Sequence, residues 1–301
     1  MRRDIAKNVI RFSIALALLG GLTAAPLPAQ TLRAPGLIEH SDLNVRVART
    51  AEAELHRDFP EADIAVLDYE RHPSGTAAVA DHAVRFAGLI GRDRLAVDHA
   101  LAEAAKAFDA REPSAHPISD SHGRVLTCLV VPAAPGSGAD AWAFQQISAT
   151  TASDYVATGD DLRHAWRIVD HEVGHCLVYS LDIKPPPGRF GPSFHENAAE
   201  YYAFVLHRQR FGATSYPLRQ AALRDAWAAT PTEATERLAR SVWNLGPAIR
   251  RAEADSAAGP DAGLTRRAAL AQAVEAASEL AMTREQVAEM TARLRTAIVG
   301  P

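Results

Sequence analysis

The 301-residue chain has only two cysteines, no excess of basic charge and no apolar run long enough to cross a membrane. Two cysteines do not define the disulfide framework of a small secreted scaffold. A formal net charge of -4, without runs of Lys or Arg interleaved with aromatic residues, argues against a nucleic-acid partner. With 48% apolar and 23% charged residues, the composition is that of a globular protein with one or two cores.

The most continuous apolar segment of the N-terminal region covers residues 14–25, fewer than the roughly 20 residues that a membrane span needs. Four basic residues precede this segment, and Pro26 to Gln30 follow it. This layout is typical of a secretory signal peptide. We therefore predict that residues 1–29 are cleaved and that the mature protein is exported, periplasmic or secreted, without a stable membrane span. An uncleaved membrane anchor is the alternative.

The two cysteines are Cys128 and Cys176. An oxidising compartment would allow them to pair. Because two cysteines alone indicate no framework, we expect two buried thiols rather than a disulfide. A disulfide between them would join a core strand to the helix that carries the motif described below.

Residues 30–158 alternate between helical and strand-like patterns, which predicts an α/β N-terminal part. The predicted helices cover 41–57, 76–90 and 95–109, and the predicted strands cover 63–67, 124–131 and 141–148. The strand over 124–131 has the clearest pattern, and Pro132 closes it. These short strands predict a small mixed sheet.

Residues 159–301 have helical patterns throughout. A long helix is predicted from the N-cap candidates Asp160 and Asp161 to about residue 181, and a second from near Ser193 to about 211. Further amphipathic helices are predicted over 235–245 and 264–298, with breaks at 231, 246–247 and 259–263. The fold class predicted for the whole chain is α+β, with a largely helical C-terminal half.

The first of these helices contains the pattern H-E-x-x-H, from His171 to His175. Helix positions four residues apart differ by about 40° around the axis, so the two histidines share one face and can hold one metal ion. Glu172 lies beside them, where it can accept a proton from a water molecule that attacks a carbonyl group. The motif lies within an apolar stretch, where three ionisable groups would be costly without a function.

A catalytic zinc site usually has three protein ligands and one open position. Glu196, on the next helix and 21 positions after His175, is our candidate for the third ligand. However, Ser193 and Glu196 also match a capping box, S-x-x-E, which would make Glu196 a helix-start residue. In that case Glu200, one turn further along, would be the ligand. His195 is a weaker third choice.

With Glu196-Asn197-Ala198-Ala199-Glu200 on the second helix, residues 160–212 resemble the gluzincin zinc metallopeptidases, which have a thermolysin-like site. Those enzymes carry E-x-x-x-D on this helix, and this chain has Glu200 in place of the Asp. The resemblance implies a Zn2+ cofactor held by His171, His175 and Glu196, with Glu172 as the general base. It also implies that Glu200 hydrogen-bonds a metal-binding histidine. A peptide or protein would be the substrate.

Several nearby residues have less definite roles. His164 lies two turns before His171, too far for the same ion, and is expected to be structural or at the rim of the cleft. Tyr201, Tyr202 or His207 could polarise a substrate carbonyl, although each is more often a packed or surface residue. Gly174 leaves room for close packing or for a substrate.

The sequence thus predicts an exported zinc-dependent metallopeptidase. Two alternatives stay open, a catalytically inert zincin-like binding or scaffold protein and a zinc hydrolase that acts on another substrate. The presence of Glu172 argues against the inert protein, because only catalysis needs this base. The strand over 124–131 or 141–148 could form the edge of the cleft and pair with an extended peptide. The oligomeric state is not predicted.

Overall fold

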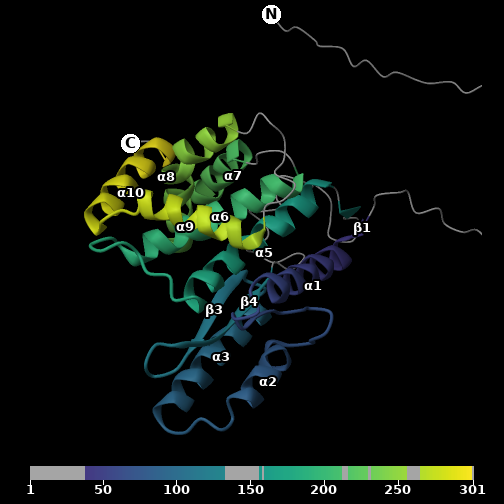
Figure 1. Cartoon of the computed structure of the whole chain (residues 1–301). Helices are drawn as coiled ribbons and strands as arrows, with labels where there is room; N and C mark the ends of the chain where they lie inside the picture. Colours follow the sequence, from purple (N-terminus) through teal and green to yellow (C-terminus); the bar gives the residue numbers. More distant parts are fainter. Residues whose placement is uncertain are drawn as a thin grey trace, which may run out of the picture. The chain divides into compact units, whose positions relative to one another are not determined.

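The computed structural model describes residues 38–132, 156–157, 159–211, 216–229, 232–255 and 265–299. The predicted signal peptide and the predicted strand over 141–148 lie outside these ranges. The fold class is α+β, as predicted. A small mixed sheet is followed along the chain by a largely helical C-terminal half (Figure 1).

The main sheet has three strands in the order β2-β4-β3, with bounds Ile64–Val66 for β2, Val125–Val131 for β4 and Ser114–Ser119 for β3. Strand β4 pairs parallel with β2 and antiparallel with β3. Its sequence, apolar except for Thr127, suits a strand that is covered on both faces. Because β4 has a partner on each side, it is not free to pair with a substrate, and the expectation that 124–131 forms a cleft edge is wrong.

Strand β3 was not predicted from the sequence. It contains Pro117, which cannot donate a hydrogen bond to a neighbouring strand and therefore weakens the strand pattern. In the described part of the sheet β3 is an outer strand, where such a residue is tolerated. A separate two-stranded ladder joins β1 (Ile38–Glu39) to β5 (Val156–Ala157).

Helices α2 (Gly75–Arg85) and α3 (Arg92–Ala110) cover one face of the main sheet. Helix α2 begins after Ser74, whose side chain accepts a hydrogen bond from the backbone N–H of Ala77. It ends five residues before the predicted position. Leu129 and Val131 of β4 point into the apolar cluster that these helices form with the sheet.

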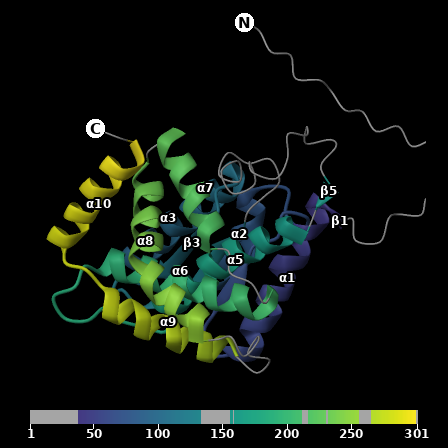
Figure 2. The same ribbon diagram turned by 90° about the horizontal axis from the view of Figure 1, so that it is seen from above.

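The other helices are α1 (His40–Asp58), α5 (Gly159–Ser180), α6 (Gly191–Phe211), α7 (Tyr216–Ala229), α8 (Glu233–Asp255), α9 (Arg266–Leu280) and α10 (Arg284–Val299). Helix α5 packs on the second face of the sheet, and α6 lies beside α5 and contacts α8 and α9 (Figure 1, Figure 2). Cys128 and Val130 of β4 point into the core on this side.

Two predicted helix boundaries are wrong. Helix α8 continues through Gly246 and Pro247, where a break was expected. Proline costs a helix about 3 kcal/mol, but Leu245 and Ile249 are buried on either side of it, and this packing keeps the helix continuous. Helix α5 begins at Gly159, so Asp160 and Asp161 lie in its first turn rather than at its N-cap.

Cys128 of β4 and Cys176 of α5 form a disulfide, with Cα atoms 5.5 Å apart. The expectation of two buried thiols is therefore wrong. The two residues lie on facing surfaces of a strand and a helix that pack together, an arrangement that spacing along the chain does not reveal. The bond fixes α5 to the central strand at the residue next to His175.

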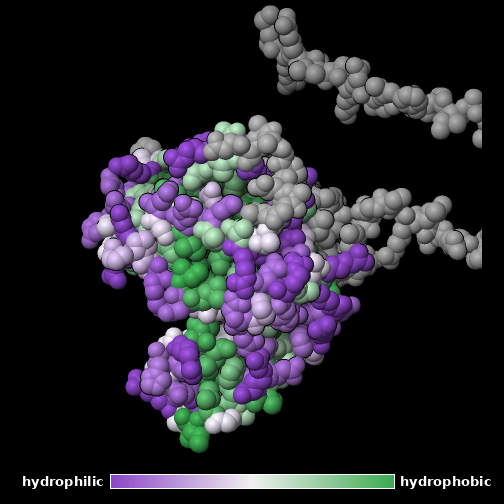
Figure 3. All heavy atoms as spheres, viewed as in Figure 1, coloured by the Kyte–Doolittle hydropathy of each residue, from purple (hydrophilic) through white to green (hydrophobic). Residues whose placement is uncertain are grey.

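Hydrophilic side chains cover most of the face shown in Figure 3, and apolar ones form a band from the middle of this face to the end where α2 and α3 meet. The exposed large apolar residues described are Val84, Ile90 and Leu95. Among the described helices, none combines the length and apolarity that crossing a membrane requires.

Candidate metal centre

The motif histidines lie on α5 at a point where this helix approaches α6 very closely. A Cβ atom added to Gly174 would lie 2.8 Å from the Cα atom of Ala199, closer than real Cβ contacts allow. Gly174 is therefore required for the packing of the two helices. This close approach brings the side chains of His171 and His175 to Glu196 on α6.

Helix α6 begins at Gly191, and the carbonyl oxygen of Phe190 accepts hydrogen bonds from the backbone N–H groups of Ser193 and Phe194. Ser193 is therefore the third residue of the helix and not its N-cap. The capping-box interpretation of Ser193 and Glu196 is wrong, and the Glu196 side chain instead lies against the two histidines.

His171, His175 and Glu196 form a group that could hold a metal ion, with one ligand atom from each residue and all three within 4.8 Å of one another. The two Nε2 atoms are 3.2 Å apart. Nε2 of His171 is 3.2 Å from Oε1 of Glu196, and Nε2 of His175 is 3.7 Å from Oε2. Ligand atoms at the usual zinc distances are about 3.4 Å apart around a tetrahedral ion, so the three groups fit such an ion.

Burial and charge keep His175 and Glu196 in the protonation states that metal binding requires. Burial lowers the pKa of His175 to about 3, so its imidazole is neutral at pH 7. Burial alone would raise the pKa of Glu196, but contact with His171, His175 and Arg237 outweighs this effect and lowers the pKa to about 2. A neutral imidazole and an ionised carboxylate are the forms that bind divalent metals.

The pKa of Glu172 is shifted upward, in contrast to those of His175 and Glu196. Burial raises the pKa of its carboxyl group to about 7, with a smaller opposing effect from His171. Its charge also interacts with those of Glu196, Arg219 and Arg237, which places it in the same electrostatic environment as the triad. A carboxyl group with a pKa near 7 can both accept and release a proton at neutral pH.

Glu200, one turn beyond Glu196, lies behind His171. Its Oε2 atom is 3.2 Å from Nδ1 of His171, although the two are not aligned as a hydrogen bond. The same carboxylate forms a buried ion pair with Arg167 and lies 3.6 Å from Nε of Arg219. Glu200 therefore pairs with Arg167, lies near Arg219 and contacts the side of His171 that faces away from the ligand atoms.

The arginines around the triad were not predicted. Arg237 of α8 lies with Nε 3.5 Å from Oε2 of Glu196. Arg167 precedes His171 by four residues, so helical spacing alone could have identified it as a neighbour on the same face. Arg219 and Arg237 lie on other helices, and no signal in the sequence connects them to the motif.

The other candidate residues are engaged elsewhere. His195 stacks on Tyr179, with ring centroids 4.8 Å apart. The hydroxyl of Tyr202 accepts a hydrogen bond from Arg266, and burial raises the pKa of this tyrosine to about 12. Tyr201 is buried and packs near Phe204.

His207 is buried eleven residues beyond Glu196, about 16 Å along the same helix, and packs near Phe211. At this distance His207 is too far from Glu196 to contact an ion held by the triad. The side chain of His164 lies outside the described part of the structure.

No protein-family model, curated protein or solved structure matches the chain. What defines the site is therefore its own geometry, a His-His-Glu group on two packed helices that could hold a metal ion.

Proposed function

We propose that the protein is an exported zinc-dependent metallopeptidase with a site of the gluzincin type. The observation that carries this proposal is the convergence of His171, His175 and Glu196 from two helices onto one point. Two imidazoles and one carboxylate are a common protein ligand set of catalytic zinc, which keeps a further position for water. The order H-E-x-x-H and then Glu196 along the chain is the order seen in that family.

Within this proposal Glu172 acts as the general base and then as the general acid. A Zn2+ ion in the site supplies Lewis-acid activation of water and of the substrate carbonyl. Glu172 accepts a proton from the attacking water and passes it to the leaving amine. Burial raises the pKa of this carboxyl group, a direction that suits a group that must release a proton as well as accept one.

Glu200 is proposed to orient His171. A carboxylate on the far ring nitrogen of a metal-binding histidine selects the tautomer that leaves the other nitrogen free for the ion. The 3.2 Å separation between Nδ1 of His171 and Oε2 of Glu200 supports this role. The longer side chain, in place of the family's Asp, also reaches Arg167.

Export is supported by the disulfide between Cys128 and Cys176, because disulfides persist mainly in oxidising compartments outside the cytoplasm. It agrees with the signal peptide proposed from residues 1–29. A periplasmic or secreted enzyme would act on peptides or proteins in that compartment.

The proposal is tested with a denatured protein as substrate, with and without a chelator, and with measurement of bound zinc. We expect Glu172→Gln to keep one zinc ion and to lose about 10²- to 10⁴-fold in hydrolysis, because only the base is removed. His171→Ala and His175→Ala are expected to lose both zinc and activity. Full activity of Glu172→Gln would contradict the mechanism.

Metal content also decides the third ligand. Glu196→Ala is expected to lose zinc, whereas Glu200→Ala keeps it with weaker affinity. Stoichiometric zinc in Glu196→Ala would transfer the ligand role to Glu200. A zinc-loaded protein that leaves all peptides intact would favour the alternatives, a zinc hydrolase for another substrate or an inert binding protein.

A further inference from the structure

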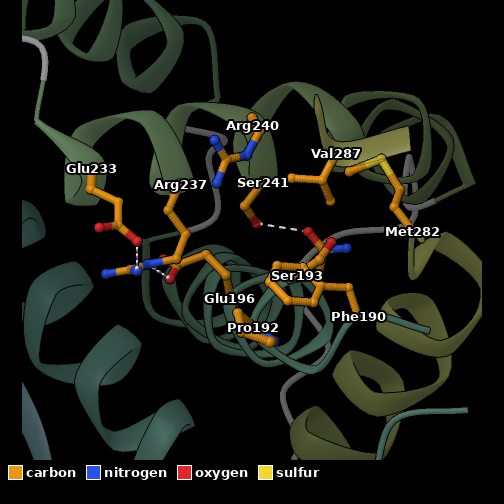
Figure 4. A pocket seen from close by; sticks show the side chains of 11 residues that line it. Phe190, Pro192, Ser193, Glu196, Glu233, Arg237, Arg240, Ser241, Met282 and Val287 are labelled. Carbon is orange, nitrogen blue, oxygen red and sulfur yellow. Dashed lines mark hydrogen bonds and ion pairs between the residues drawn. The ribbon is translucent and has the colours of Figure 1, made fainter. Parts of the chain in front are cut away.

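A pocket lies directly beside Glu196, between the first turns of α6, helix α8 and the start of α10 (Figure 4). We call it the arginine pocket. Arg237 and Arg240 of α8 line one part of it, and Phe190, Met282 and Val287 line another. The pocket therefore combines positive groups with an apolar wall, next to a proposed metal ligand.

The charge of this pocket depends on the metal. Its ionisable lining residues are two arginines and two glutamates, Arg237, Arg240, Glu196 and Glu233. Their formal charges cancel when the site holds no ion. A divalent ion on Glu196 would add two positive charges at the edge of the pocket, so the pocket would attract anions in the metal-loaded protein.

Among the described residues, Arg240 is recorded with one ion pair, and that pair is long. Its Nη1 group donates a hydrogen bond to Oγ1 of Thr291, with the two atoms 2.9 Å apart. Its paired carboxylate, that of Glu236, is 3.8 Å away and also receives a hydrogen bond from Arg295. The planar guanidinium carries five N–H donors, so donors are left for a carboxylate in the pocket.

Arg237 extends this positive surface toward the metal centre. It precedes Arg240 by three residues, so the two side chains share one face of α8. Its contacts with Glu196 and Glu233, at 3.5 Å and 3.6 Å, are longer than hydrogen bonds. A substrate carboxylate bound at Arg240 would thus lie beside the group that is proposed to hold the metal.

We propose that the arginine pocket binds a carboxylate of the substrate peptide next to the bond that is cleaved. The carboxylate comes from an acidic side chain or from the C-terminus of the peptide. Phe190, Met282 and Val287 would contact the methylene groups that carry it. This inference rests on the proposed function, because the pocket gains its positive charge from the metal and serves the same site.

The test compares peptides of equal length with Glu, Gln or Lys at the positions flanking the cleaved bond, each with a free or an amidated C-terminus. Glu and Gln have the same shape, so their difference isolates the charge. We expect kcat/KM for the Glu peptide to exceed that of the Gln peptide by about tenfold, or the free terminus to exceed the amide by about tenfold. The first result identifies a side-chain carboxylate and the second a terminal one.

Variants connect this preference to Arg240. Arg240→Met is expected to reduce the tenfold ratio to about one, and Arg240→Lys to keep part of it, because Lys has the charge without the planar fork. Arg293→Met is the matched control, since Arg293 is an exposed arginine of α10 outside the pocket. It should leave the ratio unchanged. Equal cleavage of all peptides by the wild type, or an unchanged ratio in Arg240→Met, would overturn the proposal.

Calorimetric binding to zinc-loaded Glu172→Gln separates this inference from the proposed function. Binding of the carboxylate peptide about tenfold tighter than its amide would support carboxylate binding in the arginine pocket. This holds even if the wild type cleaves neither peptide, a result that would contradict the peptidase proposal. Equal binding of the two peptides would contradict carboxylate binding in the arginine pocket. Cleavage without any carboxylate preference would support the peptidase proposal and contradict carboxylate binding in the arginine pocket.

Discussion

The two faces of β4 are covered by very different parts of the protein. Leu129 and Val131 point into an apolar cluster with α2 and α3, which we call the apolar side. Cys128 and Val130 point toward α5 and the helices around it, which we call the ionic side. Since successive side chains of a strand point to opposite faces, the three-stranded sheet, with β4 at its centre, separates the two sides.

Buried charges distinguish the ionic side. Its buried ionisable residues include Arg167, Asp170, His171, Glu196, Glu200, Arg219 and Arg266. They pair across helices, as Arg266 of α9 does with Asp170 of α5. Asp170 directly precedes His171, so this ion pair fixes α5 at the metal centre.

The buried carboxylates near the apolar side have a different use. Asp68 follows β2 and Asp120 follows β3, and each accepts hydrogen bonds from backbone N–H groups within the next four residues. These carboxylates stabilise turns at the ends of strands. Asp68 also accepts a hydrogen bond from Arg49 of α1, at 2.8 Å.

This difference indicates how stability and chemistry are divided in the protein. Buried ion pairs contribute little net stability, because removing two charges from water costs about as much as their attraction returns. Apolar burial stabilises at about 25 cal/mol per Å². Both sides of β4 contain a buried apolar cluster, and the ionic side adds buried ion pairs to its own. We therefore expect substitutions on either side to lower stability, but only those on the ionic side to change metal binding, and the following predictions test this division.

The largest effect is expected for Glu200→Gln, which leaves two buried arginines facing a neutral amide. Loss of one partner from a buried ion pair costs about 3–5 kcal/mol, and loss of a carboxylate behind a metal-binding histidine weakens metal affinity about 10- to 100-fold. Urea unfolding and competition with a zinc chelator measure the two effects.

Leu101→Ala is the matched control on the apolar side. Leu101 is buried in α3, and its truncation is expected to lower the free energy of unfolding by about 2–5 kcal/mol without changing zinc affinity. If both variants weaken zinc binding equally, the two sides are one energetic unit and the proposed division is wrong.

The sequence predicted the metal triad better than the sheet because of how each is encoded. His171 and His175 are brought together by helical periodicity alone, and Glu196 follows across one Pro-rich loop. Strand β3 and the pairing of Cys128 with Cys176 depend on contacts between segments that are distant in the chain. No local pattern specifies such contacts.

The arginines of the site show the same limit. Arg219 and Arg237 reach the carboxylates from α7 and α8, and their positions depend on how those helices pack on α6. An arginine in an amphipathic helix is ordinarily exposed, so its sequence environment does not indicate burial. The sequence thus predicted the three residues that could hold a metal ion, but not the arginines around them.

The disulfide joins α5 to β4 within the ionic side, and its removal should have the next largest effect. Cys128→Ala with Cys176→Ala opens a loop with a sequence separation of 48 residues. We expect the free energy of unfolding to fall by about 2–4 kcal/mol, because the unfolded chain gains conformational freedom. Denaturant unfolding of the variant, beside wild type with and without reductant, measures this change. Equal stability of reduced and oxidised wild type would contradict it.

Two glycines allow a matched comparison of packing on the two sides. A Cβ atom at Gly174 would meet the backbone of Ala199 at 2.8 Å, and one at Gly75 would meet the carbonyl oxygen of Ala105 at 1.9 Å. Overpacking of this kind costs about 1–3 kcal/mol. We expect both Gly174→Ala and Gly75→Ala to be less stable in urea, but only Gly174→Ala to bind zinc more weakly. Loss of zinc in Gly75→Ala would show that a packing change on the apolar side alters the candidate metal site on the other face of β4.

The smallest effect concerns the dependence of the ionic side on pH. Glu54 of α1 accepts hydrogen bonds from Arg210 and Arg266, at 2.6 Å and 2.8 Å. Burial alone would raise the pKa of Glu54, but the two arginines outweigh it and lower the pKa below its ordinary value of 4.5. The stabilisation is therefore complete above the unfolded-state pKa and is lost as the pH falls through the lower folded-state pKa.

Glu54→Gln should accordingly be less stable than wild type near neutral pH, and the difference should shrink as the pH falls below about 4. Urea unfolding at a series of pH values measures it. Glu61→Gln is the control, because its pair with Arg267 is exposed and screened by water, so its effect should be smaller at every pH. A Glu54→Gln deficit that stays constant down to the acid transition would mean that Glu54 stabilises the ionic side by packing rather than by its charge.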